Sequence, residues 1–265
     1  MMRGWYENTP GRKLPHPSEP ESMRALLVLT LVFLTLPAIA RELPGGLVYL
    51  RDIDPSIAQD MRYATNDNFT GGKLPGYDAP ECILRRDVAE ALHKVQAGLA
   101  AQKLSLKVYD CYRPTRAVAA MARWARAPED GRTKRFYPAL DKRTLFSGYI
   151  SSRSAHSTGT AVDLTLIRLP AWTKPPYDTG AAYGPCTAAN RVPDSSVDMG
   201  AGFDCFDSKS HTANATVSAE AKRWRSLLGN AMRVQGFTNY FREWWHFSFG
   251  SPAQAYDVPI APRER

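Results

Sequence analysis

The fold is decided by the stretch Ser154-Ala155-His156-Ser157-Thr158-Gly159-Thr160-Ala161-Val162-Asp163. From Thr160 to Leu169 the residues are mainly β-branched or apolar, which predicts a strand that places Val162 and Asp163 on opposite faces. His156 and Asp163 are seven residues apart, so in one continuous strand their side chains would point away from each other. We therefore place His156 in a loop before the strand, with the bend at Gly159.

A late stretch, Glu243-Trp244-Trp245-His246, supplies a second imidazole and a second carboxylate. An aspartate within a β-branched strand costs free energy unless it is paired or bound to a cation. His156, Asp163 and His246 would give zinc two nitrogens and one oxygen and leave a fourth position open for water, as in catalytic zinc sites. The alternative for His246 is a core aromatic strand with a hydrogen-bonded histidine.

Glu243 and Arg113 are the candidate catalytic residues around this metal. Trp244 and His246 share one face of the predicted strand 243–249, so Glu243 reaches the same site only from a turn or bulge. It could then accept the proton of a zinc-activated water. Arg113 follows the predicted strand 104–108 and could stabilise an oxyanion. The alternative is a surface arginine that covers Tyr112.

The other predicted elements surround these motifs. Alternation in the strand 104–108 predicts one buried and one solvated face. Apolar residues at helical spacing predict helices over 85–103, 115–127 and 218–235, with His93 on the surface of the first. Residues 41–80 and 128–148 read as irregular, and 170–215 as a long insertion rich in Pro, Gly, Asp and Ser.

Composition is that of a globular protein, with 265 residues, 44% hydrophobic and 23% charged. We predict one domain over residues 41–265. The net charge of +8 comes from scattered Lys and Arg without a nucleic-acid motif, which favours a solvated basic surface over nucleic-acid binding. A G-x-S-x-G elbow and a Gly-rich phosphate loop are absent, which argues against serine hydrolases and nucleotide-binding enzymes.

Residues 1–40 are predicted to be an N-terminal extension and a cleaved signal peptide. Met23-Arg24 precedes an apolar run over 25–36 that ends in Pro37-Ala38-Ile39-Ala40, a pattern typical of secretory signals. The run is shorter than the roughly 20 residues that span a bilayer. Met23 fits a translation start better than Met1. We expect export, with a periplasmic location and no stable membrane insertion after cleavage.

Export makes the four cysteines, Cys82, Cys111, Cys186 and Cys205, candidates for disulfides. The sequence permits three pairings. We favour Cys82–Cys111 and Cys186–Cys205, because nested or crossed pairings would join distant segments.

Five motifs, in order along the chain, resemble the zinc D-Ala-D-Ala metallopeptidases, which share a fold with the Hedgehog signalling domain. The match is closest to D-alanyl-D-alanine dipeptidases of the vancomycin-resistance type. The motifs are Tyr63-Ala64-Thr65-x-Asp67-Asn68-Phe69-Thr70-Gly71, Asp110-x-Tyr112-Arg113-Pro114-x-Arg116-Ala117-Val118, Ser154-x-His156-x-x-Gly159-x-Ala161-x-Asp163, Asp163-Leu164-Thr165-Leu166 and Glu243-Trp244-Trp245-His246.

The resemblance implies an α+β fold, with a mainly antiparallel central sheet and packed helices. It implies one zinc ion on His156, Asp163 and His246, with Glu243 as base and Arg113 as transition-state stabiliser. Substrate contacts are implied for Tyr63, Ser154 and Asp204, whose carboxylate would suit the free ammonium of a dipeptide.

The implied reaction is hydrolysis of the small molecule D-Ala-D-Ala to two D-alanines. Cys111 stands where resistance-type members have Gly, and the leader and the insertion also differ from the cytoplasmic resistance enzymes. Salvage of the dipeptide or cell-wall turnover is therefore the expected role. The alternatives are a zinc carboxypeptidase, D,D or L,D, that trims peptidoglycan peptides, and a non-catalytic zinc-bearing binding domain.

Overall fold

The structure is a computed structural model that describes residue 11 and residues 43–170, 182–251 and 254–263. The chain from Ala40 onward forms one compact unit. The predicted signal peptide lies outside the described residues. Among the residues described, no helix has the length and apolar character that a membrane crossing requires.

Two sheets form the β structure. The larger has the order β2 (Ala58–Gln59), β4 (Leu104–Asp110), β5 (Ala161–Arg168), β7 (His246–Phe249) and β6 (Phe237–Asn239). Its β2–β4 pair is parallel and its other pairs are antiparallel. The smaller sheet pairs β1 (Leu47–Tyr49) with β3 (Ile83–Arg85) in antiparallel fashion. The predicted α+β class with a mainly antiparallel sheet is confirmed.

The helices are α1 (Leu50–Ile53), α2 (Arg86–Ala100), α3 (Thr115–Arg126) and α4 (Ala219–Val234). The three longer ones lie within a few residues of their predicted bounds. Ser218 caps α4, and its hydroxyl accepts a hydrogen bond from the Ala221 amide. The 3-10 turns are η1 (Pro44–Gly46), η2 (Arg62–Ala64), η3 (Lys134–Phe136), η4 (Lys142–Ser147), η5 (Ala155–Thr158) and η6 (Ser208–Ser210).

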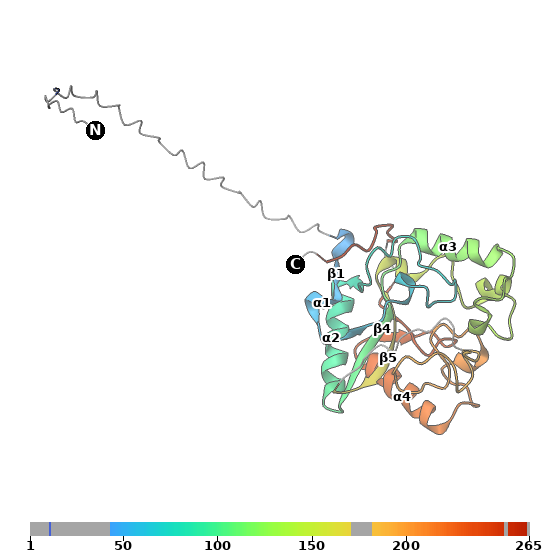
Figure 1. The fold of residues 1–265 in the computed structure, drawn as a ribbon. Helices are drawn as coiled ribbons and strands as arrows, with labels where there is room; N and C mark the ends of the chain where they lie inside the picture. Colours follow the sequence, from blue (N-terminus) through green and yellow to red (C-terminus); the bar gives the residue numbers. More distant parts are fainter. Residues whose placement is uncertain (1–10, 12–42, 171–181, 252–253, 264–265) are drawn as a thin grey trace, which may run out of the picture. The chain divides into compact units, whose positions relative to one another are not determined.

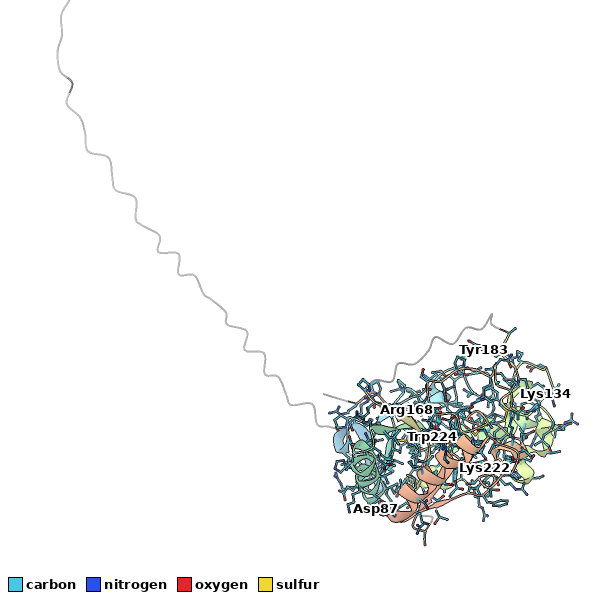
Figure 2. The ribbon with its side chains drawn as sticks, turned by 90° about the horizontal axis from the view of Figure 1, so that it is seen from below. Asp87, Lys134, Arg168, Tyr183, Lys222 and Trp224 are labelled. Atoms are coloured by element: carbon cyan, nitrogen blue, oxygen red, sulfur yellow. A yellow bond between two sulfur atoms is a disulfide. The ribbon has the colours of Figure 1, made fainter. Side chains whose placement is uncertain are left out.

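The main core lies between the large sheet and helices α2 and α4. Alternate apolar residues of β4 and β5 pack into it, namely Leu106, Val108, Val162, Leu164 and Leu166. Figure 1 shows α2 alongside β4. At the end of β5, the Arg168 guanidinium lies 4.8 Å from the Trp224 ring of α4 (Figure 2). The face of β5 that carries Asp163 is therefore turned away from this core.

The prediction that β4 has one solvated face is wrong. All seven residues of β4 are buried. Lys107 Nζ donates a hydrogen bond to the Asp194 carbonyl and lies 3.5 Å from the Asp194 carboxylate. The segment after β5 covers this face, since the Val197 amide donates to the Leu166 carbonyl at 3.0 Å. A partner almost ninety residues away along the chain thus buries a face that local alternation assigns to solvent.

Burial of Lys107 predicts a specific pH dependence of stability. Burial lowers the pKa of Lys107 to about 8 from 10.5, against the opposing charge of Asp194. Between these values the unfolded chain holds the proton and the folded chain does not, so stability rises with pH. Over the full interval the rise is about 3 kcal/mol. Buried tyrosines with raised pKa values oppose it only above about pH 10.

Urea denaturation of the wild-type protein between about pH 7 and 9.5 measures the part of this rise below pH 9.5, which is about 2 kcal/mol. A Lys107→Met variant is expected to lack it, because methionine has no proton to release. Wild-type stability that falls over the same range would contradict the assigned burial.

The four cysteines lie in the sequential pairs favoured from the sequence. Cys82 and Cys111 have their Sγ atoms 2.02 Å apart, and Cys186 and Cys205 have theirs 2.04 Å apart. The first pair joins the chain just before β3 to the chain just after β4. The second joins two parts of the long segment between β5 and α4. Both segments reach the site described next.

Candidate active site

A short turn before β5 holds His156, as predicted. The turn η5 begins after Ser154, whose hydroxyl accepts a hydrogen bond from the His156 amide at 3.3 Å. It ends at Gly159, which has a left-handed φ of 72°. A Cβ at Gly159 would lie 2.4 Å from Leu47 Cδ2, so glycine is required for both the backbone angle and the space. The bend turns His156 back toward Asp163.

Three potential metal ligands converge at this point. His156 Nε2 and His246 Nδ1 are 3.1 Å apart, and Asp163 Oδ1 lies 3.3 Å and 3.0 Å from them, respectively. Ligands about 2.0–2.1 Å from a tetrahedral zinc ion are about 3.3 Å from one another. The three atoms therefore fit one face of such a tetrahedron.

In each imidazole, one ring nitrogen has a partner outside the ligand cluster. His156 Nε2 and His246 Nδ1 therefore remain as the nitrogens that can bind a metal. His156 Nδ1 lies 2.7 Å from the Cys111 carbonyl, which can only accept a hydrogen bond, so Nδ1 carries the proton and Nε2 is the free ligand atom. His246 Nε2 lies 3.3 Å from the Ser248 hydroxyl, which leaves Nδ1 toward Asp163. Burial alone would raise the pKa of Asp163, but the two histidines hold it well below its usual range.

Glu243 comes from a turn, as the strand parity required. Its amide donates to the Tyr240 carbonyl, and the His246 amide donates to the Glu243 carbonyl just before β7 begins. Glu243 Oε2 lies 3.9 Å from His246 Nδ1, and the side chain is buried. Burial, reinforced by the charges of Asp163 and Asp204, raises the pKa of Glu243 well above its usual range. A carboxylate with a raised pKa accepts protons readily near neutral pH.

Arg113 is buried beside the ligands, so the alternative of a surface arginine is wrong. Its Nε and Nη2 lie 2.9 Å and 2.8 Å from Asp110 Oδ2, and Nη2 lies 3.7 Å from Asp163 Oδ2. Its guanidinium carbon is 5.0 Å from the Tyr63 ring centre. The Arg113 amide donates to the His156 carbonyl at 3.1 Å. The guanidinium is thus held in place from several sides.

Asp110 and Tyr77 support the site and were given no role from the sequence. Asp110 is fully buried and accepts hydrogen bonds from Arg113 and from the Tyr77 hydroxyl, the latter at 2.6 Å. It also lies 3.4 Å from His156 Nδ1. The position of Asp110 at a strand end, three residues before an arginine, is the sequence signal that could have pointed to it.

Tyr63 and Asp204 form a hydrogen-bonded pair in the site. The Tyr63 hydroxyl donates a hydrogen bond to Asp204 Oδ2 at 2.9 Å, and both side chains are buried. Burial, with the nearby charge of Asp163, raises the pKa of Asp204 well above its usual range. A cation bound beside Asp204 would restore its charged form.

All eight site residues named from the sequence line one cleft of about 930 Å³. They are Tyr63, Arg113, Ser154, His156, Asp163, Asp204, Glu243 and His246. Tyr149, Tyr240 and Trp245, which sequence reasoning did not place there, line it as well. The arrangement brings three potential metal ligands, a proton acceptor and a second buried carboxyl group into one cleft.

Comparison with known proteins places this chain in a family. The model of peptidase family M15, described as D-ala-D-ala dipeptidase, matches residues 44–174 and 171–262. This chain belongs to the D-ala-D-ala dipeptidase family. The site residues all lie within the matched ranges, so the family assignment and the cleft concern the same part of the chain.

Curated relatives cover most of both chains. The D-alanyl-D-alanine dipeptidase of Enterococcus faecium is 36% identical over 220 residues, which are 81% of this chain and 98% of the relative. That of Enterococcus faecalis is 37% identical over 77% of this chain and 91% of the relative. That of Streptomyces coelicolor is 35% identical over 82% and 99%. The chain is therefore a metallodipeptidase of family M15, and the cleft is its candidate active site.

Proposed function

We propose that this protein hydrolyses D-Ala-D-Ala to two molecules of D-alanine with one zinc ion held by His156, Asp163 and His246. The observation that carries the proposal is the position of these ligands in one cleft with a buried base, Glu243, and a buried carboxyl group, Asp204. The names of the family relatives support the same substrate.

Zinc, when bound, would polarise the scissile carbonyl and lower the pKa of a water from 15.7 to about 7. The buried carboxylate of Glu243 accepts a proton from this water and passes it to the leaving amine. The Arg113 guanidinium lines the same cleft and stabilises the negative charge that develops on the carbonyl oxygen. Asp110 holds that guanidinium through its bonds to Nε and Nη2.

Asp204 and Tyr63 select substrates with a free amino terminus. A substrate ammonium beside Asp204 would keep the carboxylate charged and replace the proton that burial otherwise favours. An N-acylated peptide lacks this charge, so Asp204 would keep its proton and form no ion pair with the substrate. Ser154, at the entrance of η5, lines the cleft near the ligands and offers a hydroxyl to the dipeptide.

Release of alanine from three substrates tests the proposal. The purified protein is incubated with D-Ala-D-Ala, acetyl-D-Ala-D-Ala and L-Ala-L-Ala, and free alanine is measured. We expect rapid release from D-Ala-D-Ala alone. Release from the acetylated dipeptide at a similar rate would instead favour a carboxypeptidase, and no release from D-Ala-D-Ala by the zinc-loaded protein would exclude the proposed reaction.

Replacing Asp204 by asparagine is expected to weaken the preference for a free ammonium. One charge-assisted hydrogen bond is worth about 1.5–3 kcal/mol, so kcat/KM for D-Ala-D-Ala should fall roughly 10- to 100-fold. The acetylated dipeptide should be unaffected or improved. Asp198→Asn is a matched control, because this more exposed aspartate lies outside the cleft and pairs with Arg191. Equal losses on both substrates would show a general structural role for Asp204.

We further propose that the protein is exported to the periplasm, where it would serve dipeptide salvage or wall turnover. The leader-like sequence 23–40 supports this. So do the two cysteine pairs, since disulfides persist in oxidising compartments. Mass spectrometry of the secreted protein, expected to begin at Arg41, tests the cleavage.

A further inference from the structure

The cleft extends beyond the residues that a dipeptide of two alanines requires. Its volume of about 930 Å³ is near the upper end of the range of roughly 300–1,000 Å³ for sites that bind drug-sized molecules. The proposed function uses the part formed by β5, β7, Tyr63 and Asp204. Most of the remaining lining comes from α3, from η4 and from the loop before Ser154.

Three arginines lie in this remaining part. Arg126 is in the last turn of α3, Arg143 is in η4, and Arg153 directly precedes Ser154. All three are exposed. Among the residues that the structure describes, no carboxylate pairs with any of their guanidinium groups. This part of the cleft is therefore a concave surface with three positive charges.

Local hydrogen bonds hold the backbone that carries Arg143 and Arg153. Asp141 Oδ1 accepts from the Arg143 amide at 2.8 Å. The Ser151 hydroxyl accepts from the Arg153 amide at 3.1 Å and donates to the Arg153 carbonyl at 2.8 Å. Asp141 Oδ1 thus accepts a hydrogen bond from the backbone of η4, and among the described residues Asp141 forms no ion pair with the Arg143 guanidinium. The side chains are left to interact with a ligand in the cleft.

Nearby acids on the same part of the chain have other partners. Asp130 pairs with Arg132 at 2.7 Å, and Glu129 Oε1 accepts from the Gly131 amide and from the Tyr137 hydroxyl. Asp204 and Glu243, by contrast, enter the cleft from segments that follow β5. The cleft therefore has an acidic part, contributed by the later segments, and a basic part, contributed by the chain between α3 and β5.

We propose that the basic part of the cleft is a subsite for an acidic side chain on the carboxyl-terminal residue of the dipeptide. This inference rests on the proposed function and deepens it by naming a wider substrate class, D-Ala-D-Xaa with acidic Xaa. An ammonium held at Asp204 directs the carboxyl-terminal residue away from the acidic part. Guanidinium groups bind carboxylates through charge-assisted and often bidentate hydrogen bonds.

The test compares D-Ala-D-Glu with D-Ala-D-Gln, which have side chains of nearly equal size and differ in charge. We expect kcat/KM of the wild-type protein to be roughly tenfold higher for D-Ala-D-Glu, as one partly exposed charge-assisted bond would give. The ratio should fall toward one at high salt, because exposed charges are screened. The ratio should also fall toward one in a triple variant that combines Arg126→Gln, Arg143→Gln and Arg153→Gln.

Arg123→Gln is the matched control, because this exposed arginine of α3 lies outside the cleft lining. It should retain the wild-type ratio. Equal rates for the two peptides in a wild-type protein that hydrolyses D-Ala-D-Ala would overturn the subsite and leave the proposed function intact. A preference that survives in the triple variant would also overturn it.

Failure of D-Ala-D-Ala hydrolysis would instead refute the proposed function. Calorimetric titration of the wild-type protein with D-Ala-D-Glu and D-Ala-D-Gln then decides the subsite on its own. Tighter binding of the acidic peptide supports it, and equal binding overturns it.

Discussion

Replacing Glu243 by glutamine is expected to lower kcat for D-Ala-D-Ala by roughly 10²- to 10⁴-fold, the usual contribution of a positioned general base. Glutamine keeps the size of the side chain and one acceptor oxygen, but it cannot accept a proton. The side chain is buried, and its Oε2 lies 3.9 Å from His246 Nδ1. KM should change little, since the backbone turn that holds the residue is unaffected.

Measuring the metal content of the variant distinguishes the loss of the general base from the loss of the metal site. Glu243→Gln protein should retain zinc at the wild-type stoichiometry, measured by elemental analysis after dialysis. Glu90→Gln is a matched control, since Glu90 is an exposed glutamate of α2. Retention of wild-type kcat in Glu243→Gln would require another proton acceptor in the cleft.

Replacing Asp163 by asparagine is expected to abolish both metal binding and activity. Asp163 Oδ1 lies within 3.3 Å of both ligand nitrogens, and asparagine offers zinc no negative charge. Zinc affinity should fall by more than about 100-fold, because even groups that only support a ligand change it by 10- to 100-fold. Activity should fall in proportion to the zinc lost, and a chelator should reproduce the effect in the wild-type protein.

Asp130→Asn provides the matched control for the loss of one carboxylate, because Asp130 lies on the surface and pairs with Arg132. It should bind zinc and hydrolyse D-Ala-D-Ala as the wild type does. Full zinc occupancy in the Asp163→Asn protein would show that a different set of residues holds the metal.

Strand parity and glycine chemistry predicted the geometry of the ligands. Side chains alternate along a strand with a period of two, so His156 could meet Asp163 only from a turn, and Glu243 could meet His246 only from outside β7. The structure has both features, with Gly159 at the bend and a turn before β7. These predictions needed only local information, because backbone geometry fixes them.

Burial of the second face of β4 could not be predicted in this way. Lys107 has the pattern of a solvated strand residue, and only the later segment with Asp194 and Val197 shows why it is buried. Asp204 is similar, because it lies in an irregular segment without periodicity. The sequence linked it to the site through family resemblance alone. The hydrogen bond between Asp204 and Tyr63 spans 141 residues, and no local propensity encodes such a contact.

Anomalous X-ray scattering from crystals of the zinc-loaded protein, collected on both sides of the zinc absorption edge, tests the central claim most directly. We predict one strong peak that lies about 2 Å from His156 Nε2, His246 Nδ1 and an Asp163 carboxylate oxygen. It should disappear in Asp163→Asn crystals. A strong peak elsewhere, for example beside His93 and Asp54 or at His211, with none between the three ligands, would contradict the assignment.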